Sequence, residues 1–243
     1  MTKANWQKLI RKSHRYLGVF LGIQFLFWTI GGLYFSWTNI KNIRGEDIRK
    51  EVSSIKINDL SSDLKDVISQ IRKSDSIHYL KAIQIADING VPNYQITFHN
   101  GERLKTVLAN VVSNEIRLPL NKDEATIIAK NSLKKESTVT SVEYLTTTNG
   151  HHEYREKPLP AFAISFEGAV NTTIYVSAEL GTVQTYRNNQ WRVFDFLWML
   201  HVMDYRNRDN INNWLLRLFS AIGLITLASG FILFGLTQKG MKK

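Results

Sequence analysis

Seven residues near the start of the chain recur at steps of three or four positions: His14, Gly18, Gly22, Phe25, Thr29, Gly32 and Ser36. This spacing places them on one stripe of a helix. Small residues on such a stripe let a second helix or a flat ligand approach the backbone closely. Because imidazole ligates metals and titrates near neutral pH, His14 at the end of this groove is the first candidate for chemistry.

His201 is the second candidate, since it ends a long apolar segment and is flanked by methionines. His151, His152 and Glu153 could bind a metal, but neighbouring residues of an extended chain point to opposite sides, so we favour a solvated loop. The sequence has no cysteine, which excludes disulfides, iron–sulfur clusters and thiolate metal ligands. It also contains no phosphate-binding loop and no flavin fingerprint.

Two segments are long and apolar enough to position these histidines in a membrane. Tyr16 to Ile40 carries no charged residue, and neither does Leu218 to Gln238. A bilayer core about 30 Å thick needs about 20 apolar residues in a helix, so each segment is predicted to cross the membrane. The first lacks a small-residue cleavage site and is predicted to be a retained signal anchor. Gln24, in the middle of this span, is expected to bond a neighbouring helix.

The formal net charge of +10 lies mainly at the two ends of the chain. The segments before Tyr16 and after Gln238 contain basic residues and no acid, whereas the middle is nearly balanced. Basic residues that flank spans mark the cytoplasmic side. We therefore predict an inner (cytoplasmic) membrane protein with both termini cytoplasmic and the middle extracytoplasmic. Membrane lipid is an expected partner, and nucleic acid is not.

The middle of the chain is predicted to be an α+β domain with an internal duplication. A helical pattern over Asp59–Ser74 is followed by three stretches of alternating apolar and polar residues, and Asn100-Gly101 indicates a hairpin between the last two. A second helix is predicted over Asn121–Lys135, opened by a capping box; three strands follow again, and Thr182 to Tyr186 is expected to extend the sheet after Leu180-Gly181. The loop from Thr147 to Pro160 is either an idle excursion or a binding element.

Two further segments have expected roles. Trp191 to Met203 is apolar nearly all round, which predicts a helix in the outer membrane interface before a polar turn. The strand from Asn171 to Ser177 is expected to expose an edge that could accept a peptide by strand addition.

Three features of this chain resemble the PepSY-associated transmembrane family. They are the entry from His14 to Gly18, the turn between Tyr175 and Gly181, and the pair Leu200-His201 before the last span. Larger members of that family are four-helix proteins that bind haem b and reduce ferric siderophores, so this chain, with two spans, resembles a minimal form. The resemblance divides the chain into a cytoplasmic segment (1-15), a first transmembrane helix (16-40), a linker (41-58), two PepSY-like repeats (59-117 and 118-190), an interfacial helix and turn (191-211), a second transmembrane helix (212-238) and a cytoplasmic tail (239-243).

The resemblance also implies haem b as the cofactor. The residues that it implies are His14 and His201 as ligands of the haem iron, Gly18 and Gly22 beside the haem, and Arg15 and Arg217 for its propionates, with lipid headgroups as the alternative partners of the arginines. The two histidines stand at opposite ends of a span, roughly 30 Å apart at 1.5 Å per residue. Ligation by two histidines at one level therefore needs a second copy, and we expect a homodimer or a subunit of a larger membrane complex.

The sequence leaves two functions open. The first is a haem-b protein of transmembrane electron transfer, with ferric (siderophore) iron as the acceptor and an electron donor that the sequence does not name. The second is a non-catalytic, membrane-anchored PepSY-like module that binds a peptide, a peptidase or a larger membrane complex.

Overall fold

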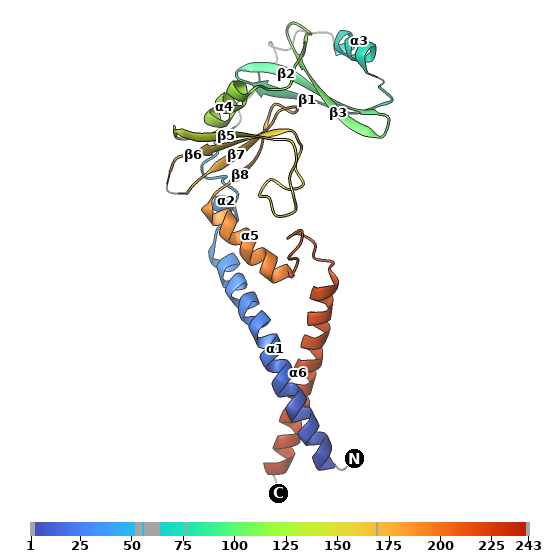
Figure 1. The fold of residues 1–243 in the computed structure, drawn as a ribbon, viewed down its shortest axis with the longest axis vertical. Helices are drawn as coiled ribbons and strands as arrows, with labels where there is room; N and C mark the ends of the chain where they lie inside the picture. The colour runs from blue at the N-terminus through green and yellow to red at the C-terminus, as the bar shows by residue number, and fades with distance from the viewer. Residues whose placement is uncertain (1–2, 52–54, 56–63, 76, 169, 242–243) are drawn as a thin grey trace. The chain divides into compact units, whose positions relative to one another are not determined.

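A computed structural model describes residues 3–51, 55, 64–75, 77–168 and 170–241. The chain divides into two compact units. The helical unit comprises Met1–Asn39 and Arg192–Lys243, and the sheet unit comprises Ile40–Trp191. The protein is thus α+β, with two long apolar helices at its ends and a sheet-rich middle (Figure 1).

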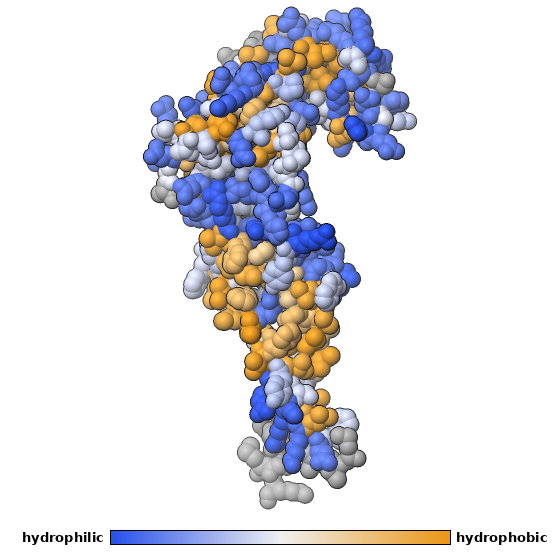
Figure 2. Space-filling view, viewed as in Figure 1, coloured by the Kyte–Doolittle hydropathy of each residue, from blue (hydrophilic) through white to orange (hydrophobic). Residues whose placement is uncertain are grey.

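The two end helices have the length and composition of membrane spans. α1 (Lys3–Trp37) and α6 (Trp214–Met241) contain the apolar segments Lys8–Trp37 and Trp214–Leu236. Only 11% of the first segment's most apolar window is buried, and none of the second's. The core helix of a soluble protein would be mostly buried, so this exposed apolar surface (Figure 2) indicates a membrane protein.

α1 and α6 cross near the two ends of the chain (Figure 1). The rings of Phe20 and Phe219 pack with centroids 5.2 Å apart, and His14 reaches Ser229. The two helices therefore pair over the N-terminal half of α1.

α5 (Asn189–Val202) covers the other half of α1 from Arg192 onward. Phe35 packs on Phe194 at 4.8 Å between ring centroids. The last carbonyls of a helix have no partner inside it, and here α1 supplies partners. Gln24 Nε2 donates to Leu200 O and Trp28 Nε1 donates to His201 O, both at 2.8 Å. The expectation that Gln24 bonds a neighbouring helix is confirmed, and α5 packs against α1 rather than standing apart.

A polar loop joins α5 to α6. The carboxylate of Asp204 accepts backbone N–H groups from Arg206, Asn207 and Asn210. Burial alone would raise the pKa of Asp204, but these backbone hydrogen bonds outweigh it and lower the pKa below its ordinary value. Arg208 Nη1 also donates to the buried carboxylate of Asp195 on α5 at 2.5 Å. The loop is therefore tied both to itself and to α5.

The first half of the sheet unit consists of one helix and an antiparallel sheet in the order β1-β2-β3-β4. Its elements are α3 (Leu64–Ser74), β1 (Tyr79–Ile88), β2 (Val91–Asn100), β3 (Arg103–Asn110) and β4 (Ile116–Arg117). Val67 and Ile71 of α3 are buried against the face of the sheet that carries Ile96 and Phe98. The hairpin at Asn100-Gly101 is confirmed, since Asn100 pairs with Arg103 and Gly101 has φ +62°.

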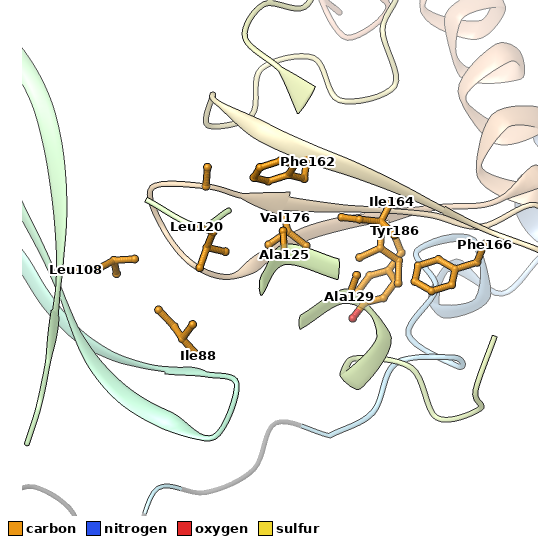
Figure 3. Close-up of a cluster of buried hydrophobic side chains, with 12 residues drawn as sticks. Ile88, Leu108, Leu120, Ala125, Ala129, Phe162, Ile164, Phe166, Val176 and Tyr186 are labelled. Carbon is orange, nitrogen blue, oxygen red and sulfur yellow. The ribbon is translucent and has the colours of Figure 1, made fainter. Parts of the chain in front are cut away.

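The second half repeats this order of helix and sheet. Its elements are α4 (Lys122–Asn131), β5 (Val139–Leu145), β6 (Ala161–Phe166), β7 (Thr173–Ser177) and β8 (Val183–Arg187), and a short helix, α2 (Ile40–Ile43), opens the unit. The capping box of Asn121 and Glu124 is present. Ile88 and Leu108 of the first sheet share a core with Ala125 and Val176 of the second half (Figure 3). The short strand β4 is a fourth strand that the sequence did not predict, whereas β8 confirms the predicted extension of the second sheet over Thr182 to Tyr186.

The structure corrects the expectation of a free edge, and it shows how the long loop is held. The segment from Asn171 to Ser177 offers no free edge, because β7 pairs with β6 on one side and β8 on the other. The loop from Thr147 to Pro160 is anchored by Tyr154, which is fully buried and stacks on Tyr175 at 4.6 Å between ring centroids. Burial raises the pKa of Tyr154 to about 12.

Candidate functional site

His14 lies at the contact between α1 and α6. Its Nδ1 atom is 2.8 Å from Ser229 Oγ. Gly230 leaves room for the imidazole, since a Cβ added there would approach His14 Cε1 to 3.2 Å. The register of the two helices therefore fixes the position of the ring.

The hydrogen bonds of Ser229 determine which nitrogen of His14 carries the proton. Ser229 donates its hydroxyl hydrogen to Thr226 O at 2.7 Å, so toward His14 it can only accept. His14 must then donate Nδ1–H, which leaves the lone pair on Nε2. Histidines that ligate metals typically have this arrangement, with the second ring N–H donated to an outer partner.

An open groove of about 480 Å³ begins at His14. Its other lining residues come from α6: Thr226, Leu227, Gly230, Phe231 and Phe234. The hydroxyl of Thr226 is already used, because it donates to Ile222 O. The volume falls within the roughly 300–1,000 Å³ of small-molecule sites. The groove therefore suits a flat apolar ligand that can be coordinated by the Nε2 lone pair of the imidazole.

Gly18 and Gly22 continue from His14 along an exposed face of α1. A Cβ added at either glycine would meet nothing within 4 Å, and Phe25 and Thr29 farther along are also exposed. Because His14 belongs both to this stripe and to the groove, the two surfaces adjoin. Neither surface is covered by another described part of the chain.

His201 is enclosed by aromatic rings. It stacks on Trp198 with centroids 6.1 Å apart and an interplanar angle of 11°, and Phe35 and Trp28 lie 5.9 and 6.1 Å away. Its Nδ1 atom is buried and has no hydrogen-bond partner among the described residues. Ligation through Nε2 would thus require a buried Nδ1–H without an acceptor, which costs free energy. His201 lacks the outer partner that His14 has.

The structure keeps the two histidines at different levels, as the sequence predicts. The carbonyl of His201 is bonded by Trp28, which follows His14 by fourteen residues on one continuous helix, α1. At 1.5 Å per residue this separation is about 21 Å along the axis. His14 and His201 of one chain therefore cannot ligate the same iron.

The two arginines are also separated. Arg15 follows His14 directly, and its guanidinium lies 5.3 Å from the ring centroid of Tyr16. Arg217 stands thirteen residues before Gly230 on α6, or about 20 Å along the helix. Arg15 is therefore close enough to bind the carboxylates of a ligand at His14, whereas Arg217 is too far away.

The surroundings of His14 would suit haem b on two counts. The imidazole presents a lone pair on Nε2, and the adjoining groove is apolar. The sequence did not reveal Ser229 or Thr226 as partners of this site. The signal available in the sequence was the small-residue pair Gly223 and Gly230 on the second span.

The pair His151-His152 and its neighbour Glu153 have local roles. His152 Nδ1 accepts Tyr154 N–H at 3.0 Å, and Glu153 Oε1 accepts the hydroxyl hydrogen of Tyr175 at 2.8 Å. No cluster of three metal-ligating side chains occurs among the residues that the structure describes.

Comparisons with protein-family models, curated proteins and solved structures find no match to this chain. The assignment of a function therefore depends on the geometry at His14 and on the sequence patterns.

Proposed function

We propose that this protein is a haem-b membrane redox protein in which His14 is an axial ligand. The observation that carries the proposal is the pair of hydrogen bonds at Ser229, which puts the imidazole proton on Nδ1 and leaves Nε2 beside an apolar groove. Bound there, haem b supplies a one-electron couple, and two histidine ligands leave no open position for oxygen chemistry.

A second copy of the chain would supply the second histidine ligand. His201 is about 21 Å away along α1, and the open stripe at Gly18 and Gly22 lets a second helix approach closely. The groove beside His14 is open on one side, so a partner copy would complete the apolar enclosure. We therefore propose a homodimer with one haem between two His14 rings.

The basic residues near His14 favour the binding of a ligand that carries carboxylates at this end of α1. Arg15 is adjacent in sequence, and Arg11 and Lys12 lie within the preceding turn. They suit the propionates of haem or the headgroups of anionic lipid. By the same charges, both termini are cytoplasmic and the sheet unit is extracytoplasmic in the inner membrane.

Electron transfer to ferric iron outside the membrane is the extended form of this proposal. It requires a second acceptor near His201, because the levels of the two histidines differ by about 21 Å. Any redox group at that level would lie beside His201 and its aromatic neighbours, which would hold it rather than carry the electron themselves.

The test is the visible spectrum of detergent-purified protein, oxidised and then reduced with dithionite. We expect a low-spin Soret band that shifts on reduction, is absent in His14→Ala and persists in His201→Ala. Ferric reductase activity of reconstituted protein should be lost in both variants. A colourless protein from haem-sufficient cells, or an unchanged band in His14→Ala, would refute the proposal.

A further inference from the structure

A cleft in the sheet unit lies between its two halves. Its volume is about 580 Å³. One wall contains Gln84, Ile85, Ala86 and Asp87 of β1, and the opposite wall contains Thr182, Val183 and Tyr186 around β8. β1 and β8 are the end strands of the two different sheets. The cleft therefore has a sheet edge on each side.

The edge of β1, and not only one of its faces, borders this cleft. Successive residues of a strand point to opposite faces, yet four consecutive residues, Gln84–Asp87, all line the cleft. A strand can meet a cleft with both faces only where its edge is turned toward it. An edge presents backbone N–H and C=O groups that are not used within the sheet.

The pairing of β1 with β2 identifies which backbone groups point into the cleft. Asp87 is opposite Pro92, which has no N–H and whose carbonyl accepts Val111 N–H on the far side, at 3.1 Å. The pair Asp87–Pro92 is thus not hydrogen-bonded. Because such pairs alternate in an antiparallel ladder, Ile85 opposite Tyr94 is also not hydrogen-bonded to β2. The N–H and C=O groups of Ile85 and Asp87 therefore point outward.

The side chains around the cleft match the chemistry of a polypeptide. Gln84, Asn89, Gln95 and Asn131 are carboxamides, which donate and accept hydrogen bonds as peptide groups do. Apolar contact is offered by Ile85, which is 39% exposed. Basic and acidic groups are both present at the cleft, as Arg49 and Glu51 illustrate, so a strongly charged ligand is not favoured.

We propose that this cleft binds an extended segment of a partner protein by strand addition to β1. The segment pairs with Ile85 and Asp87, and about four residues of it lie along the roughly 10 Å from Gln84 to Asp87. The inference concerns the sheet unit alone and does not depend on haem binding by the helical unit.

The experiment uses the full chain in detergent and a display library of random dodecapeptides. Peptides enriched on the wild type are synthesised, and amide hydrogen exchange of the protein is followed residue by residue with and without them. We expect slower exchange at Ile85 and Asp87 and little change at Gln84 and Ala86, whose N–H groups already bond β2. Protection confined to other segments would overturn the proposal.

Two variants and a matched control complete the test. Ile85→Lys places a charge at the edge, and Ile85→Pro removes an outward N–H without removing a bond to β2. Each should weaken peptide binding by about tenfold or more. The control Ile116→Lys has the same substitution on β4, at the opposite end of the sheet and with a similar exposure of 40%. It should bind like the wild type, and equal binding by all four proteins would refute the site.

Discussion

At the scale of single residues, the chemistry of His14 depends on a serine of another helix. Ser229 satisfies Thr226 O with its one proton and is then an obligatory acceptor for His14. An outer acceptor of this kind orients an imidazole ligand and raises its basicity. His201 has aromatic neighbours about 6 Å away but no such acceptor among the described residues, so the two histidines differ in their ability to hold a metal.

Replacing Ser229 by alanine tests this dependence. Ser229→Ala removes the acceptor for Nδ1–H without altering the groove, so haem affinity should fall by about 10- to 100-fold. The measurement is a titration of haem-free protein with haem, followed at the Soret band. Ser220→Ala, at an exposed position of the same helix, is the matched control. Equal affinities in the two variants would show that Ser229 does not orient the ligand.

Asp204 gives the helical unit a specific pH dependence. Backbone hydrogen bonds hold its pKa below the ordinary value despite burial, so its stabilising effect is complete above about pH 4 to 5 and is lost as the pH falls through the lowered pKa. Asp204→Asn should lower the free energy of unfolding by about 1–3 kcal/mol at pH 7, and the difference from wild type should shrink as the pH falls through the lowered pKa of Asp204. Denaturant unfolding in mild detergent measures it.

The exposed Glu102 in the hairpin between β2 and β3 supplies the control for this experiment. Glu102→Gln removes one negative charge at a site without a network of backbone donors, so its effect at pH 7 should stay within about 0.5 kcal/mol. If Asp204→Asn and Glu102→Gln behaved alike across the pH range, the loop network would have no special role.

At the scale of elements, the position of α5 depends on side chains of α1. Gln24 and Trp28 bond the carbonyls at the end of α5, and Asn213 bonds Val202 O while its Oδ1 accepts Leu216 N–H at the start of α6. A helix end inside apolar surroundings needs such partners, because no water is present to bond its carbonyls. The polar residue in the middle of the first span therefore has a structural role.

Gln24→Leu should loosen α5 without unfolding the sheet unit. The substitution leaves Leu200 O without its donor, at a cost of about 1 kcal/mol. Amide exchange in the last turn of α5 should become several times faster, while exchange in β6 and β7 stays unchanged. Thr29→Val is the control, since Thr29 is exposed and donates only within its own helix, to Phe25 O. Unchanged exchange in α5 of Gln24→Leu would contradict this role.

At the scale of the whole molecule, local patterns predicted the elements but not the contacts between them. Long uncharged apolar runs placed α1 and α6, helical spacing and a capping box placed α3 and α4, and alternation placed most strands. The register of α1 on α6, which brings Ser229 to His14, is set by side-chain packing between distant segments. No spacing within one helix encodes it. In the same way, alternation could not distinguish the interior strand β7 from the edge strand β1, because strand order depends on the partners.

The oligomeric state connects the site to the molecule as a whole. Gly18 and Gly22 are exposed and touch nothing, so leucine at either position is tolerated within one chain but prevents close approach of a second helix. We expect Gly18→Leu and Gly22→Leu to shift the detergent-solubilised protein from dimer to monomer and to lose the Soret band together. Sedimentation and absorbance on the same sample measure both.

Ala228→Leu is the control for these variants, because Ala228 is exposed on α6 and does not line the groove at His14. It should keep both the dimer and the haem. The combination of results separates the alternatives. A monomer that retains haem would mean that both ligands come from one chain, which would contradict the separation of about 21 Å between the two histidines. A dimer that persists in both glycine variants would mean that the copies meet elsewhere, and the haem between two His14 rings would then be refuted.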